Sequence, residues 1–331
     1  MFQPLLTVNN LSVDFEIRGG VVPVIDGISF DLQAGETLSL VGESGCGKSM
    51  TALAIMGLIP SPPGRRASGS ILLEGEDLLM ASEKRKQEIR GNEISMVFQE
   101  PMTSLNPVYT VGEQISETLR RHQNLSKSRA KDKTVELLEL VRIPIAGDRV
   151  NHYPHQLSGG MRQRVMIAMA LACNPKILLA DEPTTALDVT VQAEIFDLIK
   201  DLRKNTDTAI ILITHDMGSV SEMAEKVLVM YAGRKIEEGK VDDILLRPKH
   251  PYTKGLIASV PHLQQTVSIE RQFLDEIPGM VPPLAEFGRK CCMFAPRCHV
   301  ASDQCWQEKP GLIQVSESQF SACWNFEREA H

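Results

Sequence analysis

Short, almost wholly apolar runs recur along the chain, and segments with helical spacing lie between them. Such runs predict strands covered on both faces, because a strand with one exposed face would alternate apolar and polar positions. The runs occupy residues 37–41, 94–98, 176–180, 208–214 and 227–231. Apolar side chains at i, i+3 and i+4 predict amphipathic helices in segments 111–119, 134–141 and 191–204. Strands joined by helical crossovers predict an α/β sheet with helices on its faces.

Two other regions have weaker patterns. Residues 5–8, 11–15 and 22–30 are rich in β-branched and aromatic side chains, so we expect strands near the N-terminus. Residues 120–133 are dense in charge. Such a segment predicts a solvated face or a loop.

The composition is that of an ordinary globular protein and limits its partners. The 331 residues suffice for two domains, or for one large domain with an appendage. A formal net charge of −7 leaves no basic excess to neutralise phosphates, so we expect no nucleic-acid partner. The N-terminal residues lack the features of a secretory leader, and no apolar run approaches the roughly 20 residues that span a bilayer. We therefore expect a cytosolic chain, or one that reaches a membrane through partners.

The clearest motif follows the first buried run. Residues 42–49 read GESGCGKS and match G-x-x-x-x-G-K-[ST], with a predicted strand before them and a predicted helix after them. Glycines let the backbone turn tightly around a diphosphate and direct N–H groups at its oxygens. Lys48 would place a charge between the outer phosphates, and the Ser49 hydroxyl would ligate Mg²⁺. The motif predicts a phosphate-binding loop for a nucleotide.

Polar residues follow three of the other buried runs. Asp181 and Glu182 end one run, Gln99 ends another, and His215 ends a third. Catalytic residues of open α/β sheets gather where parallel strands end. Asp181 is therefore a candidate for the Mg²⁺ shell and Glu182 for the general base, with a solvated acidic turn as the alternative. From the pattern alone, a strand-capping role is favoured for Gln99. A histidine after a strand is usually structural, but His215 would share the edge that carries Asp181 and Glu182, which favours a contact with the terminal phosphate.

Two further features could contact a nucleotide. Ser158 is a good helix N-cap residue, and Gly159 and Gly160 follow it, so residues 158–160 predict a second helix start that faces an anion. A capped helix after a turn is the alternative. Phe15 lies on a β-rich segment and could stack on adenine, but the pattern alone favours a core phenylalanine.

Five of the seven cysteines lie after residue 290. In the cytosol they should not form disulfides. Four of them have the spacing C-x₅-C-x₆-C-x₁₇-C: Cys292, Cys298, Cys305 and Cys323. Four thiolates suggest tetrahedral ligation of a metal, and loops wider than those of zinc ribbons favour a [4Fe–4S] cluster. Zinc and free thiols are the alternatives.

The motifs as a set resemble the ATP-binding subunits of ABC transporters over roughly residues 5–255. Leu-Ser-Gly-Gly-Met at residues 157–161 resembles the family signature, which few other nucleotide-binding proteins contain. The phosphate loop, Gln99, the two carboxylates, the turn at residues 186–188 and His215 follow in the family order. The sequence from His250 onward resembles the extension of dipeptide, oligopeptide and nickel importers, and is closest to the D-type ATPase subunits of dipeptide permeases.

This resemblance implies the fold and the domain boundaries. An ABC-type P-loop ATPase domain, with a mixed sheet and a parallel core, would span residues 5–255 and include a helical subdomain at about 100–170. A small Cys-rich extension would span residues 256–331. The stretch CMFAPRC at residues 292–298 is similar to one in peptide-importer ATPases, which adds to the case for a metal there.

The resemblance also implies a role for each motif residue. ATP would be bound by Phe15, Gly42, Glu43, Ser44, Gly45, Cys46, Gly47, Lys48 and Ser49. Mg²⁺ would be held by Ser49, Gln99 and Asp181. Hydrolysis would use Glu182, His215, Gln99 and Lys48. A partner chain's ATP would meet Leu157, Ser158, Gly159, Gly160 and Met161, with Asp188 in the D-loop.

The family mechanism then predicts function and partners. Two such domains sandwich two ATP molecules, so that ATP closes the pair and hydrolysis reopens it. We expect an ATP-hydrolysing subunit that energises import of di- and oligopeptides, or of nickel chelates, through two transmembrane permease subunits. A second, related ATPase would complete the pair, with a homodimer as the alternative, and an extracytoplasmic solute-binding protein would act indirectly. The chain would lie peripherally on the cytoplasmic face of the inner membrane. A soluble ABC-type ATPase not coupled to transport is the rival.

Cys46 stands where serine is frequent in this group. A thiol at a helix N-terminus should have a lowered pKa. We therefore expect alkylation of Cys46 to block ATP binding, and bound ATP to protect the thiol.

Overall fold

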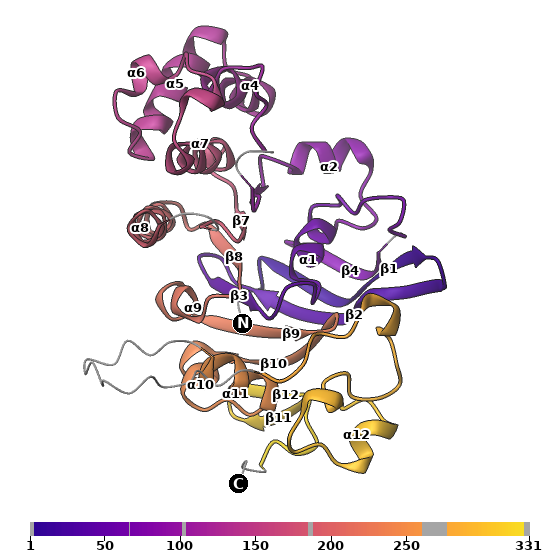
Figure 1. Ribbon diagram of the computed structural model, residues 1–331. Helices are drawn as coiled ribbons and strands as arrows, with labels where there is room; N and C mark the ends of the chain where they lie inside the picture. The colour runs from indigo at the N-terminus through magenta and orange to yellow at the C-terminus, as the bar shows by residue number, and fades with distance from the viewer. Residues whose placement is uncertain (1–2, 66, 101–103, 185–187, 260–276, 328–331) are drawn as a thin grey trace, which may run out of the picture. The chain divides into compact units, whose positions relative to one another are not determined.

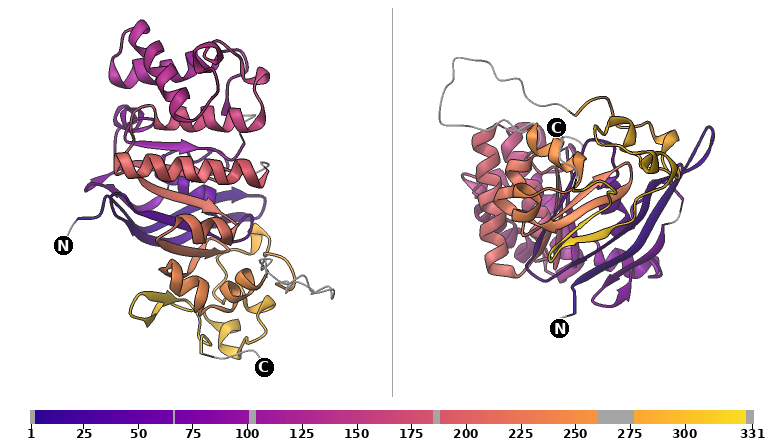
Figure 2. Two further views of the ribbon diagram at one scale, coloured as in Figure 1. Left: turned by 90° about the vertical axis from the view of Figure 1, so that its left-hand side faces the viewer. Right: turned by 90° about the horizontal axis from the view of Figure 1, so that it is seen from below.

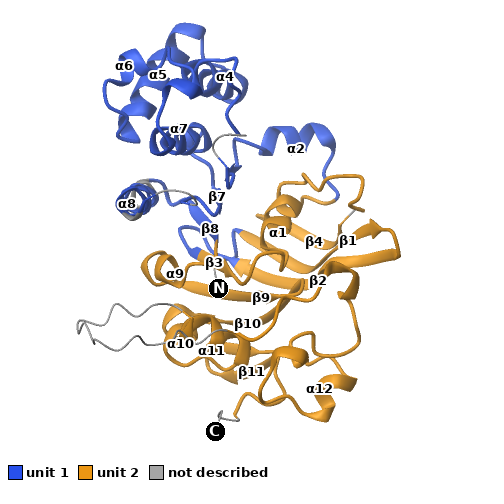
Figure 3. Cartoon of the chain, viewed as in Figure 1, with its two compact units in different colours: residues 1–5, 32–37, 80–213 blue, residues 6–31, 38–79, 214–331 orange. Residues whose placement is uncertain are grey.

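The chain forms two compact units, which Figure 3 colours separately. The structure is a computed structural model that describes residues 3–65, 67–100, 104–184, 188–259 and 277–327. The first unit comprises residues 1–5, 32–37 and 80–213, and the second comprises residues 6–31, 38–79 and 214–331. Among the described residues, no helix has both the length and the apolar character needed to cross a bilayer.

The first unit contains three adjacent parallel strands, two of which, β7 and β8, are labelled in Figure 1. The central strand β7 (Ile177–Asp181) pairs with β6 (Ile94–Val97) on one side and with β8 (Ala209–Thr214) on the other. All five residues of β7 are buried, as the apolar run predicts. Because the strands are parallel, the residues that follow β6 and β7 leave the sheet at the same edge.

The described part of the first unit also contains several helices. They are α2 (Glu83–Ile89), α4 (Val111–Gln123), α5 (Lys127–Leu140), α6 (Ala146–Arg149), the 3₁₀ turn η1 (Pro154–Gln156), α7 (Gly159–Leu171) and α8 (Val189–Thr206). Helices α4, α5 and α7 pack on one another. A buried hydrogen bond between the hydroxyls of Ser116 and Thr134, 2.9 Å long, joins α4 to α5.

The charged segment at residues 120–133 is mostly helical. It contains the end of α4 and the first half of α5, and only residues 124–126 connect them. Ser126 caps α5 by accepting a hydrogen bond from the backbone N–H of Arg129. The expectation of a solvated face was therefore right for most of the segment, and that of a loop was right only for its middle.

The second unit contains an antiparallel sheet with the strand order β2-β1-β4-β5. Its strands are β1 (Leu6–Ile17), β2 (Gly20–Leu32), β4 (Ser68–Leu73) and β5 (Glu76–Asp77). The two short runs expected at residues 5–8 and 11–15 form one strand. The register of β1 against β4 shifts between Asn9 and Ser12, and Asn10 has a φ of 47°. This bulge interrupts the alternating pattern and explains why the sequence indicates two strands.

Five further strands described in this unit lie side by side in the order β11-β12-β10-β9-β3. They are β3 (Thr37–Val41), β9 (Lys226–Tyr231), β10 (Arg234–Lys240), β11 (Ile313–Ser316) and β12 (Gln319–Ser321). Strand β3 is parallel to β9, whereas the other pairs are antiparallel. The unit's helices and turns are α1 (Lys48–Ile55), α9 (Met217–Met223), α10 (Val241–Leu246), α11 (Pro251–Ala258), η2 (Leu284–Glu286), η3 (Ala295–Arg297) and α12 (Asp303–Gln307).

The C-terminal segment, residues 277–327, shares the core of these strands (Figure 2). Phe287 and Phe294 belong to the same buried cluster as Val229 and Tyr231 of β9 and Tyr252 of α11. Strand β12 pairs directly with β10. The segment is therefore packed into the second unit and does not form a core of its own.

Candidate functional site

The phosphate loop of the second unit has the backbone conformation that its glycines predict. Strand β3 is buried throughout, and α1 begins at Lys48, with Gly47 as its N-cap at a φ of 99°. Gly42 has a φ of 149°, and a Cβ there would lie 2.3 Å from the carbonyl oxygen of Met230. Any side chain at position 42 would collide with β9, so this glycine is required by the close approach as well as by its φ.

Lys48 is held across the loop by the backbone. Its side chain is buried, with Nζ donating to the carbonyl oxygens of Gly42 at 2.7 Å and Glu43 at 3.0 Å. A buried ammonium is costly unless it is paired or hydrogen-bonded. The loop thus fixes one positive charge at the start of α1, where the helix dipole is also positive. Ser49 lies in the first turn of the same helix.

Cys46 does not have the reactive character expected of it. The thiol is fully buried, and this desolvation raises its pKa even though the Lys48 ammonium acts in the opposite direction. The expected lowering of the pKa by the helix N-terminus is therefore wrong. The free-energy cost of removing a thiolate from water is larger here than the stabilisation by the helix N-terminus and Lys48.

Phe15 and His215 also belong to the second unit. Phe15 is half-buried on β1 and pairs as an isolated bridge with Gly64. His215 follows β8 and is exposed. The next residue, Asp216, caps α9 by accepting hydrogen bonds from the N–H groups of Gly218 and Ser219, each at 3.0 Å. This cap fixes the backbone beside the histidine.

In the first unit, the structure brings together two of the predicted residues at one edge of the sheet. Gln99 lies just beyond β6 and Glu182 directly follows β7, and the Gln99 amide donates to the Glu182 carboxylate at 2.8 Å. Asp181 is buried at the end of β7. The Glu182 N–H donates to the carbonyl of Ile213 at 2.9 Å.

Glu182 adopts an uncommon backbone conformation. Its φ is 44°, in the left-handed region that few residues other than glycine populate. Such strain clusters at functional sites, where the surrounding structure holds it in place. Sequence patterns missed one residue that supports this turn, Gln163 of α7, which is buried and donates a hydrogen bond to the carbonyl of Pro183.

The signature residues form the start of α7. Ser158 is the N-cap, and its Oγ accepts from the N–H of Met161 at 3.3 Å, which confirms the expected capped helix. Ser158 and Gly159 are exposed, whereas Leu157 is buried. A Cβ on Gly160 would lie 3.0 Å from Val191 of α8, so glycine lets the two helices approach. The helix start therefore presents an open, anion-favouring surface.

The turn expected at residues 186–188 lies mostly outside the described residues. Asp188 itself is exposed and is the N-cap of α8, where its carboxylate accepts from the N–H of Val191 at 2.9 Å.

The [4Fe–4S] cluster expected in the C-terminal segment is wrong, and the zinc alternative has no support. Within the part of the chain that the structure describes, no group of three or more His, Cys, Asp or Glu side chains is arranged to hold a metal ion. Each of the C-terminal cysteines is a free thiol. Burial raises the pKa of Cys292 to about 11 and of Cys323 to about 12, so these free thiols are protonated near neutral pH.

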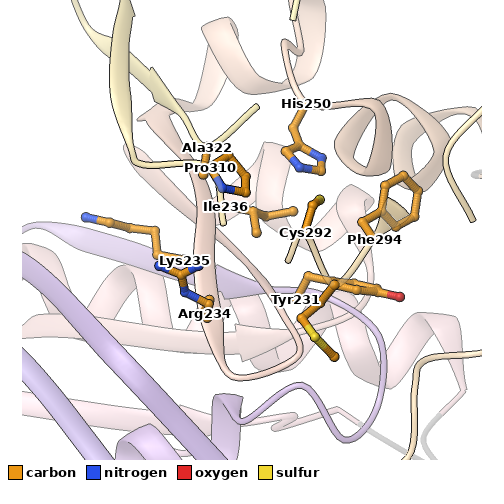
Figure 4. Close-up of a pocket in the computed structure, with 10 residues that line it drawn as sticks. Tyr231, Arg234, Lys235, Ile236, His250, Cys292, Phe294, Pro310 and Ala322 are labelled. Atoms are coloured by element: carbon orange, nitrogen blue, oxygen red, sulfur yellow. The ribbon is translucent and has the colours of Figure 1, made fainter. Parts of the chain in front are cut away.

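The surroundings of Cys292 explain the direction of its pKa shift. Its thiol lines a small pocket beside the rings of Tyr231, His250 and Phe294 (Figure 4). Aromatic neighbours of this kind offer little compensation for a buried negative charge.

Comparison with known proteins adds to these observations. Residues 25–185 match the family model described as ABC transporter, and residues 236–305 match that described as Oligopeptide/dipeptide transporter, C-terminal region. The chain is 53% identical to the oligopeptide transport ATP-binding protein OppD of Bacillus subtilis (strain 168), over 97% of this chain and 88% of that protein. It is 49% identical to the dipeptide transport ATP-binding protein DppD of the same strain, over 97% and 95% of the two chains.

The fold is that of an ATP-binding cassette. A solved dimeric structure of such a cassette in a post-hydrolysis state, bound to ADP and Pi, matches with a TM-score of 0.64 and 27% identity over 71% of this chain and 98% of that one. Cassette fold and phosphate loop define a nucleotide-binding protein of the ABC class. Within that class, the chain belongs to the family of oligopeptide and dipeptide transport ATP-binding proteins.

Proposed function

We propose that this chain hydrolyses ATP to energise the import of di- and oligopeptides through a separate transmembrane permease. The observation that carries the proposal is the similarity to OppD and DppD over almost the whole chain, since both proteins are named for peptide transport. A phosphate loop with a buried lysine held across it supports ATP as the energy source. Those names specify peptides and not nickel chelates, the other cargo expected from the sequence.

The second unit would bind the nucleotide. Lys48 would contact the terminal phosphate, because its ammonium is already held within the loop by two carbonyls. Ser49 would offer its hydroxyl to Mg²⁺, and Phe15 would stack on the adenine. His215 is exposed and would contact the γ-phosphate.

The first unit would supply the chemistry of hydrolysis. Glu182 would accept a proton from the attacking water, and the Gln99 amide at 2.8 Å would orient that carboxylate. With Asp181 and Ser49, Gln99 offers oxygen donors, the type that Mg²⁺ prefers. Mg²⁺ held by these residues would neutralise negative charge on the phosphates. Glu182 must be ionised to act, so the reaction requires its carboxylate form.

The signature would act on a second ATPase chain. Ser158 and Gly159 are exposed at the N-terminus of α7, a surface that suits the phosphates of a nucleotide bound by a partner. We propose a related ATPase as that partner, with a homodimer as the alternative. We also propose residues 5–255 as the ATPase domain, with its helical part at about 100–170, and residues 256–331 as a C-terminal extension that packs against it.

The remaining partners follow from peptide import. Two transmembrane permease subunits would carry the solute, and an extracytoplasmic binding protein would deliver it. The chain would lie peripherally on the cytoplasmic face of the inner membrane. The rival proposal, a soluble ABC-type ATPase, predicts that the chain purifies without integral membrane partners.

The replacement Glu182→Gln tests the catalytic proposal in the assembled transporter. Phosphate release should fall by about 10²- to 10³-fold, because the general base is lost, while the Kd for ATP stays within about threefold. Glu117→Gln, the same change at an exposed position of α4, is the matched control and should be fully active. Hydrolysis at the normal rate in Glu182→Gln would refute the assignment. Hydrolysis by a wild-type chain that neither copurifies with a permease nor drives peptide uptake into proteoliposomes would favour the rival.

A further inference from the structure

The C-terminal segment holds the phosphate loop through one ion pair. Arg297, at the end of η3, donates from Nη1 to Glu43 Oε2 at 2.7 Å and from Nη2 to Glu43 Oε1 at 2.9 Å. The two residues are 254 positions apart in the sequence. Two parallel hydrogen bonds fix the orientation of a carboxylate as well as its distance. We propose that Arg297 is a positioning residue that sets the conformation of the phosphate loop for ATP binding.

The guanidinium is itself rigidly placed. Its side chain is only 5% exposed, and Nε donates to the carbonyl of Pro278 at 2.8 Å. The centre of the guanidinium lies 5.8 Å from the ring of Tyr231 and 5.9 Å from that of Phe294. Arginine combines this packing on aromatic rings with a planar fork, which lysine lacks.

A second contact, from α11, holds Glu43. The backbone N–H of Glu43 donates to the hydroxyl of Tyr252 at 2.7 Å. The Tyr252 ring packs edge-on against Tyr231 and Phe294, the rings that also support Arg297. One aromatic cluster thus holds both the main chain and the side chain of a single loop residue.

Glu43 in turn contacts Lys48, the lysine of the phosphate loop. The carbonyl oxygen of Glu43 accepts from Lys48 Nζ at 3.0 Å, so Arg297, Glu43 and Lys48 form a continuous chain of contacts. Loss of the ion pair would leave Glu43 held to the aromatic cluster by Tyr252 alone, and would loosen one of the two carbonyls that hold Lys48. Arg297 would then affect ATP affinity without touching the nucleotide.

The competing interpretation is that Arg297 only attaches the C-terminal segment to the rest of the unit. The chain offers a matched control, because Lys309 makes an attachment of the same kind. Its Nζ pairs with Asp26 of β2 at 2.7 Å, with no contact to the loop. A purely structural role predicts that the loss of either pair has the same consequences.

The experiment compares Arg297→Gln and Lys309→Gln in the full chain assembled with its permease and partner ATPase. The KM for ATP should rise about tenfold in Arg297→Gln with kcat within about twofold, whereas Lys309→Gln should lower the Tm but leave KM unchanged. Arg297→Lys, which keeps the charge and loses the fork, should fall between wild type and Arg297→Gln. A lowered Tm with an unchanged KM in Arg297→Gln would overturn the inference.

Glu43→Gln keeps the test decisive if Arg297→Gln does not fold. This variant should also raise KM about tenfold, and the double variant should do so no further, because both changes break the same contact. A double variant with a hundredfold effect would contradict the coupling. The inference rests on the proposed ATP role of the loop, so Lys48→Ala is included. Activity in Lys48→Ala would defeat that role, whereas an inactive Lys48→Ala beside an unaltered Arg297→Gln would defeat only the inference.

Discussion

Two cysteine-containing regions of the second unit show what residue spacing can and cannot specify. In the phosphate loop, the spacing of glycines matches the backbone in detail, since Gly42 approaches β9 more closely than any side chain would allow. In the C-terminal segment, a comparable spacing of cysteines suggests a metal cluster that the described residues do not form. A glycine acts on the conformation at its own position, whereas ligation depends on how distant positions converge.

The same two regions agree on a second point. Cys46 of the loop and Cys292 of the C-terminal segment both have raised pKa values, and burial is the largest cause in each. Cys46 has a neighbouring ammonium and a helix N-terminus, yet desolvation still prevails. Sequence context identifies the charges near a thiol but not its burial, which decides the direction of the shift.

The largest effect should come from Gly42→Ala. The new Cβ would lie 2.3 Å from the carbonyl oxygen of Met230 in a backbone with a φ of 149°, so the loop must move away from β9. We expect the affinity for ATP to fall at least 100-fold and the free energy of unfolding to fall by about 3 kcal/mol. Nucleotide titration and urea unfolding measure the two quantities.

Gly45→Ala separates close approach from backbone strain. Gly45 also has a positive φ, 81°, but a Cβ there meets nothing within 4 Å. Its loss of stability should be only about 1–2 kcal/mol, the cost of placing an L-residue in the left-handed region. Equal destabilisation by the two alanines would show that the contact with β9 has no special importance.

Features of the fold and site could be predicted when the residues that determine them are adjacent in the sequence. The buried strands β7 and β8 and the capped start of α7 follow from adjacent residues, and the sequence identifies each. The pairing of Gln99 with Glu182 required the parallel topology, from which the shared edge follows. The hairpin of β11 and β12 lacks a buried apolar run, because its first strand is mostly exposed, and it was missed.

Contacts between distant positions that do not follow from the strand topology had no signal in the sequence. Arg297 lies in a cysteine-rich stretch, and the cysteines drew the interpretation toward a metal. Its partner Glu43 is one of the variable positions in the loop motif, which constrains only the glycines, the lysine and the hydroxyl. The sequence around Arg297 and the sequence around Glu43 therefore give no indication that the two residues, 254 positions apart, form a bidentate pair.

An intermediate effect should appear at His250, beside the C-terminal aromatic cluster. Full burial lowers its pKa to about 3 from an ordinary 6.5, while Nδ1 accepts from the N–H of Tyr252 at 3.0 Å. Below pH 6.5 the unfolded chain binds a proton here that the folded chain does not, so stability falls as the pH falls from 6.5 toward 3. At pH 5 this costs about 2 kcal/mol relative to neutral pH.

The variant His250→Asn isolates this contribution. Its side-chain oxygen can accept from the same N–H and cap α11, but it does not titrate. Glu237, which accepts from the His250 N–H, has a pKa raised mainly by burial and so favours the folded state in acid. Urea unfolding at pH 5 and pH 7.5 gives the change in the free energy of unfolding for each protein. Subtracting the change in the variant from that in wild type removes the contribution of Glu237, which both proteins share. An equal loss of stability in acid in both proteins would contradict the assignment to His250.

The smallest effect on activity should come from treating the protein with a reagent that alkylates Cys46, the cysteine of the phosphate loop. The thiol is fully buried and its pKa is raised by burial, so little thiolate is available to iodoacetamide near neutral pH. Wild type and Cys46→Ser should lose ATPase activity at rates that differ by less than about twofold, with or without ATP. Rapid inactivation of wild type that ATP prevents, and that Cys46→Ser escapes, would mean that the loop opens enough to hydrate the thiol. The helix N-terminus and Lys48 would then outweigh burial, and the two cysteine regions would differ in electrostatics as well as in backbone geometry.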